Sequence, residues 1–189
     1  MLNLVQDESE RIGARFLDPT CGSGSGLEQV LRRKLATVDL KYGKSECERR
    51  HFALLALMCL YGIDLQAQNV VDCRARLLKI IADHLNLPVY HELCRAASGV
   101  LTQNIVRDDA LQMCAHPSPR FTFAEWRYLG GGKFRRRDFR FDSLIVPSGF
   151  TAGSSPFDDA EPHERFTPAR TYPPMTVTEL AAAAPGAAG

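Results

Sequence analysis

The chain lacks long hydrophobic runs and paired cysteine motifs. No apolar stretch approaches the roughly 20 residues that a membrane-spanning helix requires. Residues 1–8 are acidic and do not have the form of a signal peptide. The six cysteines include no Cys-x-x-Cys pair, which argues against a disulfide framework or a zinc site and is typical of reduced thiols. These absences predict a cytoplasmic protein with no membrane partner and no structural metal.

The net charge is also small, at +1, so the chain as a whole does not have the charge of a nucleic-acid-binding protein. Any such role must come from local clustering, and residues 133–140 combine five cations with two aromatic residues. This composition suits phosphate contacts with some base stacking, whereas a solvated surface is the alternative interpretation. The candidate nucleic-acid residues are Lys133, Arg135, Arg136, Arg137 and Arg140.

A glycine-rich turn follows a short apolar strand near the start of the chain. Residues 15–17 predict the end of a buried strand, and residues 27–35 predict a helix with apolar positions three and four apart. Between them, Gly22, Gly24 and Gly26 predict a tight turn whose backbone N–H groups approach a ligand at a helix N-terminus. Neither the Lys-Ser/Thr pair of a phosphate loop nor the Gly-x-Gly-x-x-Gly spacing of dinucleotide folds is present. The turn favours a nucleotide-like ligand, although a plain loop and a phosphate-binding loop remain open.

An acidic residue ends the next predicted strand. Residues 59–65 predict a strand that reaches Asp64. Residues 66–85 predict a helix that packs on the sheet through one apolar face, formed by Val70, Cys73, Leu77, Ile80 and Ile81. In an open parallel sheet the ligand lies beyond the carboxyl ends of the strands, where an acid can accept both ribose hydroxyls of a nucleoside. Asp64 is therefore a candidate ribose ligand, and a cap of the following helix is the alternative.

The segment Asp18-Pro19-Thr20-Cys21-Gly22-Ser23-Gly24 resembles the S-adenosylmethionine (SAM) binding motif of adenine-specific DNA methyltransferases from bacterial restriction-modification systems, roughly Asp-Pro-x-Cys-Gly-Ser-Gly. The run Tyr61-Gly62-Ile63-Asp64 is similar to the second motif of that family, whose acid holds the ribose. Residues 104–111 are similar to the third, Asn-Ile-x-x-Gly-Asp-Ala-Leu, whose Asp lies beside the adenine. The resemblance implies SAM as cofactor and the following contacts: Asp18, Pro19, Cys21, Gly22 and Gly24 near the methionine, Asp64 and Leu65 near the ribose, and Asp109 and Ala110 near the adenine. A solvated acidic turn is the alternative for Asp109.

The resemblance implies an α/β fold of the Rossmann-like class I SAM-dependent methyltransferase type, with a doubly wound, mostly parallel sheet. Strands at residues 15–17, 59–65, 103–106 and 141–146 form only the first part of the family's seven-stranded sheet, so we expect a truncated sheet with an open edge. An open edge favours a partner subunit or a homodimer. Residues 1–150 are predicted to form the SAM-binding domain. Residues 151–189, rich in Pro and Ala, are predicted to be a disordered tail with a transient helix at 176–184.

The catalytic loop is where the chain departs from the family. After the fourth strand the family has Asn/Asp-Pro-Pro-Tyr/Phe, which binds the flipped-out base and accepts hydrogen bonds from its amino group. This chain has Pro147-Ser148-Gly149-Phe150, which keeps Phe150 for stacking and offers Ser148 one position out of register. Losing such a polar group typically costs about two to three orders of magnitude in rate. Three functions stay open: methyl transfer from SAM to a base of DNA, a non-catalytic SAM-binding or nucleic-acid-associated module, and methylation of a smaller or different acceptor, such as RNA or protein.

Overall fold

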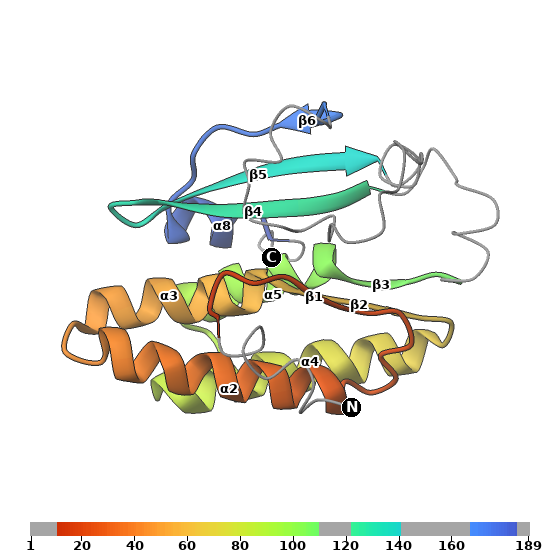
Figure 1. Cartoon of the computed structure of the whole chain (residues 1–189), viewed down its shortest axis with the longest axis horizontal. Coiled ribbons are helices and arrows are strands. Elements are labelled where there is room, and N and C mark those ends of the chain that lie inside the picture. The colour runs from red at the N-terminus through yellow and green to blue at the C-terminus, as the bar shows by residue number, and fades with distance from the viewer. Residues whose placement is uncertain (1–10, 110–121, 141–166, 185–189) are drawn as a thin grey trace, which may run out of the picture.

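The computed structural model describes residues 11–109, 122–140 and 167–184 (Figure 1). It has a mixed α/β architecture, as the sequence predicts, built from two small sheets and packed helices. Figure 1 shows helices α2 and α4 along one side of the molecule and sheet B on the opposite side, with sheet A between them. The predicted strand at 141–146 lies outside the described residues.

Sheet A is parallel and contains β1 (Phe16–Asp18), β2 (Leu60–Asp64) and β3 (Ile105–Arg107) in that spatial order. Leu17 pairs with Tyr61, and Ile63 pairs with Val106. β2 is central and almost wholly buried, which explains its continuous apolar sequence. All three strands therefore end at the same edge of the sheet.

Two helices connect each pair of neighbouring strands. The helices are α2 (Ser25–Tyr42), α3 (Glu46–Met58), α4 (Ala67–Leu85) and α5 (Glu92–Asn104). The buried face of α4 contains the apolar positions that the sequence predicts, and Asn86 ends the helix in the left-handed conformation. Near the end of α2, Tyr42 stacks on Phe52 of α3 with ring centroids 3.6 Å apart, so the two helices pack against each other beside their short connection. Ser45 caps α3 by accepting from the Glu48 N–H.

Sheet B is antiparallel and was not predicted. Its strands are β4 (Thr122–Gly130), β5 (Lys133–Arg140) and β6 (Arg170–Thr171). The turn between β4 and β5 uses three consecutive glycines with positive φ, which is why the chain can reverse there. Phe134 is fully buried beneath the hairpin, and β4 contacts α3 and α5.

A buried amide joins the two sheets. Asn104, at the end of α5, donates through Nδ2 to the carbonyls of Met58 and Leu60, 3.0 Å away in each case. Its Oδ1 accepts from Trp126 Nε1 in β4, also at 3.0 Å. All polar atoms of this side chain are satisfied in a dry environment, which fixes how β4 lies on the helical layer.

Part of the predicted disordered tail is folded, which corrects that expectation for residues 167–184. Helix α8 (Val177–Ala182) begins with a capping box between Thr176 and Glu179, and Leu180 and Ala181 are buried. A Cβ added at Gly99 of α5 would lie 3.1 Å from the Cβ of Ala184, so the glycine permits a close approach. The tail folds because it docks on α5, a contact far apart in sequence that composition does not reveal. Residues 151–166 and 185–189 lie outside the described residues.

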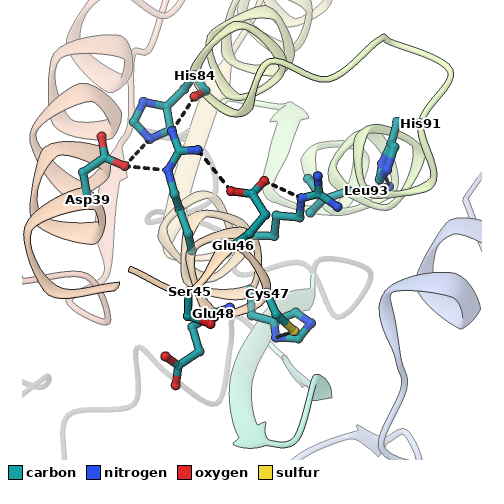
Figure 2. Close-up of polar contacts among 11 residues, drawn as sticks. Asp39, Ser45, Glu46, Cys47, Glu48, His84, His91 and Leu93 are labelled. Carbon is teal, nitrogen blue, oxygen red and sulfur yellow. Dashed lines mark hydrogen bonds and ion pairs between the residues drawn. The ribbon is translucent and has the colours of Figure 1, made fainter. Parts of the chain in front are cut away.

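The ends of three helices meet in a polar cluster on the α2–α4 side. Figure 2 shows Asp39 of α2 facing His84 of α4, and His84 Nε2 lies 3.2 Å from Asp39 Oδ1. Arg49 of α3 donates to Asp39 Oδ1 at 2.7 Å and to the His84 carbonyl at 2.8 Å. This cluster ties the helical connections together at their termini. None of the helices in the described ranges combines the length and apolarity that a bilayer span requires.

Candidate functional site

The carboxyl ends of the three parallel strands carry acidic residues. β1 ends at Asp18, β2 ends at Asp64, and β3 is followed by Asp108 and Asp109. The Asp108 N–H donates to the Asp64 carbonyl at 3.1 Å, which continues the pairing of β2 and β3 past the last strand residue. The structure thus brings together at one edge the acids that the sequence placed on three separate strands.

The glycine turn between β1 and α2 lies against the end of β2. Gly22 and Gly24 have φ values of +52° and +89°, which side chains rarely adopt. The Cys21 N–H donates to the Ile63 carbonyl at 3.0 Å, and the Gly24 N–H donates to the Cys21 carbonyl at 2.9 Å. Because the N-cap of α2 is a glycine, no cap side chain accepts from the first-turn N–H groups. Those donors and the positive end of the helix dipole are available to a ligand.

Asp64 holds the turn and the start of α4 at once. Its Oδ2 accepts from the Gly22 N–H at 3.0 Å, while Oδ1 accepts from the Gln66 N–H at 2.8 Å and from Asn69 Nδ2 at 3.0 Å. The hydrogen bond from Gln66, followed by those from Asn69 and Gly22, lowers the pKa of this carboxyl. Asp64 is therefore ionised at neutral pH. Since an ionised carboxylate offers about four acceptor positions, Oδ2 keeps acceptor capacity for a ligand hydroxyl.

The carboxyl edge of sheet A has three further predicted site residues: Asp18, Leu65 and Asp109. Asp18 Oδ1 accepts from the Thr20 N–H at 3.1 Å, and its Oδ2 would lie 3.2 Å from a Cβ at Gly26, so the carboxylate lies at the start of α2. Leu65 is 62 % exposed and presents apolar surface beside Asp64. The Asp109 N–H donates to Asp108 Oδ1 at 2.8 Å. Polar and apolar groups are thus combined at this edge of sheet A.

Two buried thiols lie under the glycine turn. Cys21 and Cys73 are hydrogen-bonded, and both are buried. This hydrogen bond and burial raise the pKa of Cys21, so it stays protonated. A Cβ added at Gly24 would lie 2.7 Å from Cys73 Sγ, and one at Gly62 would lie 2.9 Å from Cys21 Sγ. The two glycines are therefore required by this packing as well as by the backbone.

Sequence reasoning missed Asn69 and Cys73. They lie four residues apart on α4 and so share a helix face, and that face is directed at Asp64 and the glycine turn. The four-residue spacing of two polar side chains on the helix after Asp64 is visible in the sequence and could have indicated both residues. Three predicted site residues, Ala110, Ser148 and Phe150, lie outside the described residues.

The predicted nucleic-acid residues lie on β5 of sheet B, not at the edge of sheet A. Arg136 donates to both oxygens of Asp138, at 2.6 and 2.9 Å, and to Gln103 Oε1 at 2.9 Å. Arg137 donates through Nε to Glu125 Oε2 at 2.6 Å. Lys133 is exposed and Arg135 is partly buried. The side chain of Arg140 lies outside the described part of the chain.

Within the described ranges, no group of three or more His, Cys, Asp or Glu side chains is arranged to hold a metal ion. Comparisons with protein-family models, curated proteins and solved structures find no match to this chain.

Proposed function

We propose that the chain is a SAM-dependent methyltransferase with a Rossmann-like class I domain, related to the DNA adenine methylases of restriction-modification systems. The methyl acceptor is a nucleic-acid base. The observation that carries the proposal is the hydrogen bond between the Gly22 N–H and Asp64 Oδ2, which joins a glycine turn to a strand-end acid at the carboxyl edge of a parallel sheet.

The arrangement suggests how a SAM molecule would be held. The turn at Gly22 and Gly24 would enclose the methionine, with Asp18 at its start. Asp64 would accept from a ribose hydroxyl through Oδ2, and a second hydroxyl would replace the Asn69 contact at Oδ1. Asp109 would lie at the adenine, and the exposed Leu65 would cover apolar surface of the ligand. SAM supplies a sulfonium methyl group that is transferred by direct displacement, so the protein mainly has to align the two reactants.

The decisive experiment is a calorimetric titration with SAM, with its demethylated product and with ATP. We expect the first two to bind and ATP not to bind, since no Lys-Ser/Thr pair follows the turn.

Asp64→Asn keeps the shape of the side chain but removes its charge, and it should weaken SAM binding by about 1.5–3 kcal/mol. Asp72→Asn is the matched control, because Asp72 is an exposed acid of the same helix α4, where it accepts from Gln68. Absence of SAM binding in a folded sample, or equal affinity of Asp64→Asn and the parent, would contradict the proposal.

The sequence Pro147-Ser148-Gly149-Phe150 favours a second candidate, a non-catalytic SAM-binding module. It lacks the Asn or Asp acceptor that the family places at the target amino group. Transfer of a labelled methyl group from SAM to DNA, RNA and protein distinguishes the two candidates. Labelled nucleic acid supports the enzyme, whereas SAM binding without any labelled acceptor supports the module.

The proposal includes a cytoplasmic location and a partner chain. β1 and β3 are the outer strands of sheet A in the part of the chain that the structure describes. Their outer edges suit pairing with a subunit or a second copy of the chain.

A further inference from the structure

Two thiols meet beneath the glycine turn. Cys21 belongs to the turn, Cys73 lies on α4, and their side chains are hydrogen-bonded although the two residues are far apart in the chain. Cys73 Sγ lies against Gly24, where an added Cβ would be 2.7 Å away, and Cys21 Sγ lies against Gly62 of β2, where the distance would be 2.9 Å. The pair is therefore enclosed between the turn, the central strand and α4.

The hydrogen bond gives the two sulfurs different reactivities. The bond from Cys21 lowers the pKa of Cys73, with support from Arg76 and Arg74, whereas burial and Asp18 act in the opposite direction. The same hydrogen bond raises the pKa of Cys21, so Cys21 keeps its proton and donates it to the Cys73 sulfur. Because the thiolate is the nucleophilic form of cysteine, Cys73 is the more reactive member of the pair.

Two other buried cysteines have different surroundings. Cys59 Sγ donates to the Gly13 carbonyl at 3.5 Å, and burial raises its pKa. Burial also raises the pKa of Cys94. Both of these thiols therefore stay protonated and unreactive. Among the buried cysteines that the structure describes, Cys73 is the one whose pKa is lowered by a neighbouring thiol.

A disulfide between Cys21 and Cys73 would change the shape of the turn. Its sulfurs are about 2.05 Å apart, closer than two hydrogen-bonded thiols, so bond formation must draw the two residues together. Helix α4 has little room to follow, because a Cβ at Gly24 would already lie 3.3 Å from Cys73 Cα. Cys21 must move instead, and its backbone holds the turn: its carbonyl accepts from the Gly24 N–H at 2.9 Å, and its N–H donates to the Ile63 carbonyl at 3.0 Å.

We propose that Cys21 and Cys73 form a redox-sensitive pair, and that their oxidation to a disulfide by a peroxide reshapes the glycine turn and prevents it from holding its ligand. Because Cys21 retains 4 % exposure, the pair reaches the surface at the turn itself. The effect on SAM rests on the proposed function. Formation of the disulfide depends only on the two thiols.

The chemistry balances with hydrogen peroxide as the oxidant. The Cys73 thiolate attacks one peroxide oxygen, so an S–O bond forms and the O–O bond breaks, and the departing hydroxide takes up the proton that Cys73 released. The Cys21 sulfur then attacks the resulting sulfenic acid, so the S–S bond forms and the S–O bond breaks. The departing oxygen takes up the Cys21 proton and leaves as water. The two thiols lose two electrons, and the peroxide is reduced to two water molecules.

The test treats the full chain, purified in the reduced state, with hydrogen peroxide at low molar excess. The remaining thiols are blocked with N-ethylmaleimide, and disulfide-linked peptides are identified by mass spectrometry without reduction. We expect the predominant linkage to join Cys21 to Cys73 and to disappear on treatment with dithiothreitol. If the two thiols stay free, or if their main product is anything other than this linkage, the proposal is wrong.

Cys73→Ser is the test variant, since it keeps the size of the side chain but removes the sulfur. Cys59→Ser is the matched control, because Cys59 is a buried cysteine whose thiol contacts the Gly13 carbonyl. Peroxide should form the linkage in the control and not in the test variant. Peptide mapping of the parent keeps the proposal testable even if the test variant does not fold.

SAM affinity is measured by calorimetry before oxidation, after oxidation and after dithiothreitol. Oxidation should weaken SAM binding by roughly tenfold or more in the parent and in Cys59→Ser, and dithiothreitol should restore it. Peroxide should leave the SAM affinity of Cys73→Ser unchanged. Equal SAM affinity of the reduced and the disulfide-linked parent would overturn the proposed effect on the turn.

Hydrogen exchange separates this proposal from the proposed function. Exchange of the Gly22 and Gly24 amides should change on oxidation and return after dithiothreitol, whether or not SAM binds. A parent that forms the linkage and shows this change but never binds SAM removes the methyltransferase and leaves the redox-sensitive turn supported. A parent that binds SAM but forms no linkage removes the redox pair and leaves the methyltransferase. Unchanged exchange at both amides in the linked protein contradicts the reshaping of the turn.

Discussion

Gly24 determines the shape of the candidate site more than any side chain does. Its φ of +89° allows the chain to turn from β1 into α2, and its missing side chain leaves room for Cys73 Sγ. Any side chain at position 24 would therefore meet two obstacles: the backbone conformation would be strained, and its Cβ would lie 2.7 Å from Cys73 Sγ. The turn, the α2 N-terminus and the first residues of α4 are therefore fixed relative to one another.

Gly24→Ala should lower the free energy of unfolding by about 1–3 kcal/mol, which is the usual cost of a strained backbone conformation. Gly22→Ala tests the strain alone, because a Cβ at Gly22 meets nothing within 4 Å. Gly13→Ala is the neutral control, since Gly13 has neither a positive φ nor a close neighbour. We expect the order Gly24→Ala, Gly22→Ala, Gly13→Ala in urea denaturation, from the largest loss to the smallest. Equal stability of the first and third variants would show that the turn tolerates a side chain.

At the scale of elements, α8 shows a short helix stabilised by tertiary contact. Six residues are too few to form an isolated helix in water. The capping box of Thr176 and Glu179 satisfies the first N–H groups, and Leu180 is buried against α5. The helix therefore exists because of its docking site and contributes to the stability of the whole domain.

Leu180→Ala should destabilise the protein by about 2–5 kcal/mol, the range found when a buried leucine is truncated. Thr178→Ala, an exposed position of the same helix, should have a much smaller effect. Differential scanning calorimetry of the two variants provides the comparison. A midpoint for Leu180→Ala equal to that of the parent would mean that α8 does not pack on α5 in solution and that the predicted disorder extends through this segment.

At the scale of the whole molecule, two histidines link stability to pH. His84 lies in the polar cluster of Figure 2, and His51 lies under the β4–β5 turn, where a Cβ at Gly132 would be 3.0 Å from its ring. Burial lowers the pKa of both rings below the ordinary value of 6.5. Asp39 beside His84 and Glu48 near His51 offset only part of this effect. The folded protein therefore binds protons at these rings less readily than the unfolded chain does.

Stability should fall as the pH decreases through 6.5 toward the lowered pKa values, and it should be fully present above 6.5. The sign follows because the unfolded chain takes up more protons in this window. Urea denaturation on both sides of pH 6.5 measures the slope, and the double variant His51→Gln/His84→Gln should flatten it. The carboxyl groups of Asp64, Glu28 and Glu179 also have lowered pKa values, but they do not affect this pH window. The stability that they add is lost only when the pH falls below the ordinary carboxyl pKa. A slope that is the same in parent and double variant would contradict the assignment to these rings.

The sequence by itself determined the parallel layer. Local patterns were sufficient for the strands at β1, β2 and β3 and for the buried face of α4, because hydrophobic periodicity and glycine turns are properties of neighbouring residues. They also placed Asp18, Asp64 and Asp109 at or shortly after the carboxyl ends of these strands. Since parallel strands end at one edge, the grouping of these acids followed from the same patterns.

Only the tertiary structure decided the rest. Sheet B depends on the Asn104–Trp126 hydrogen bond and on the burial of Phe134, and α8 depends on docking to α5. These contacts join residues far apart in the chain, so they cannot be predicted from local composition. The positions of the cations of β5 also depend on contacts between distant residues. The pairing of β4 with β5 places Arg135 opposite Arg127, and Arg136 points inward and donates to Asp138.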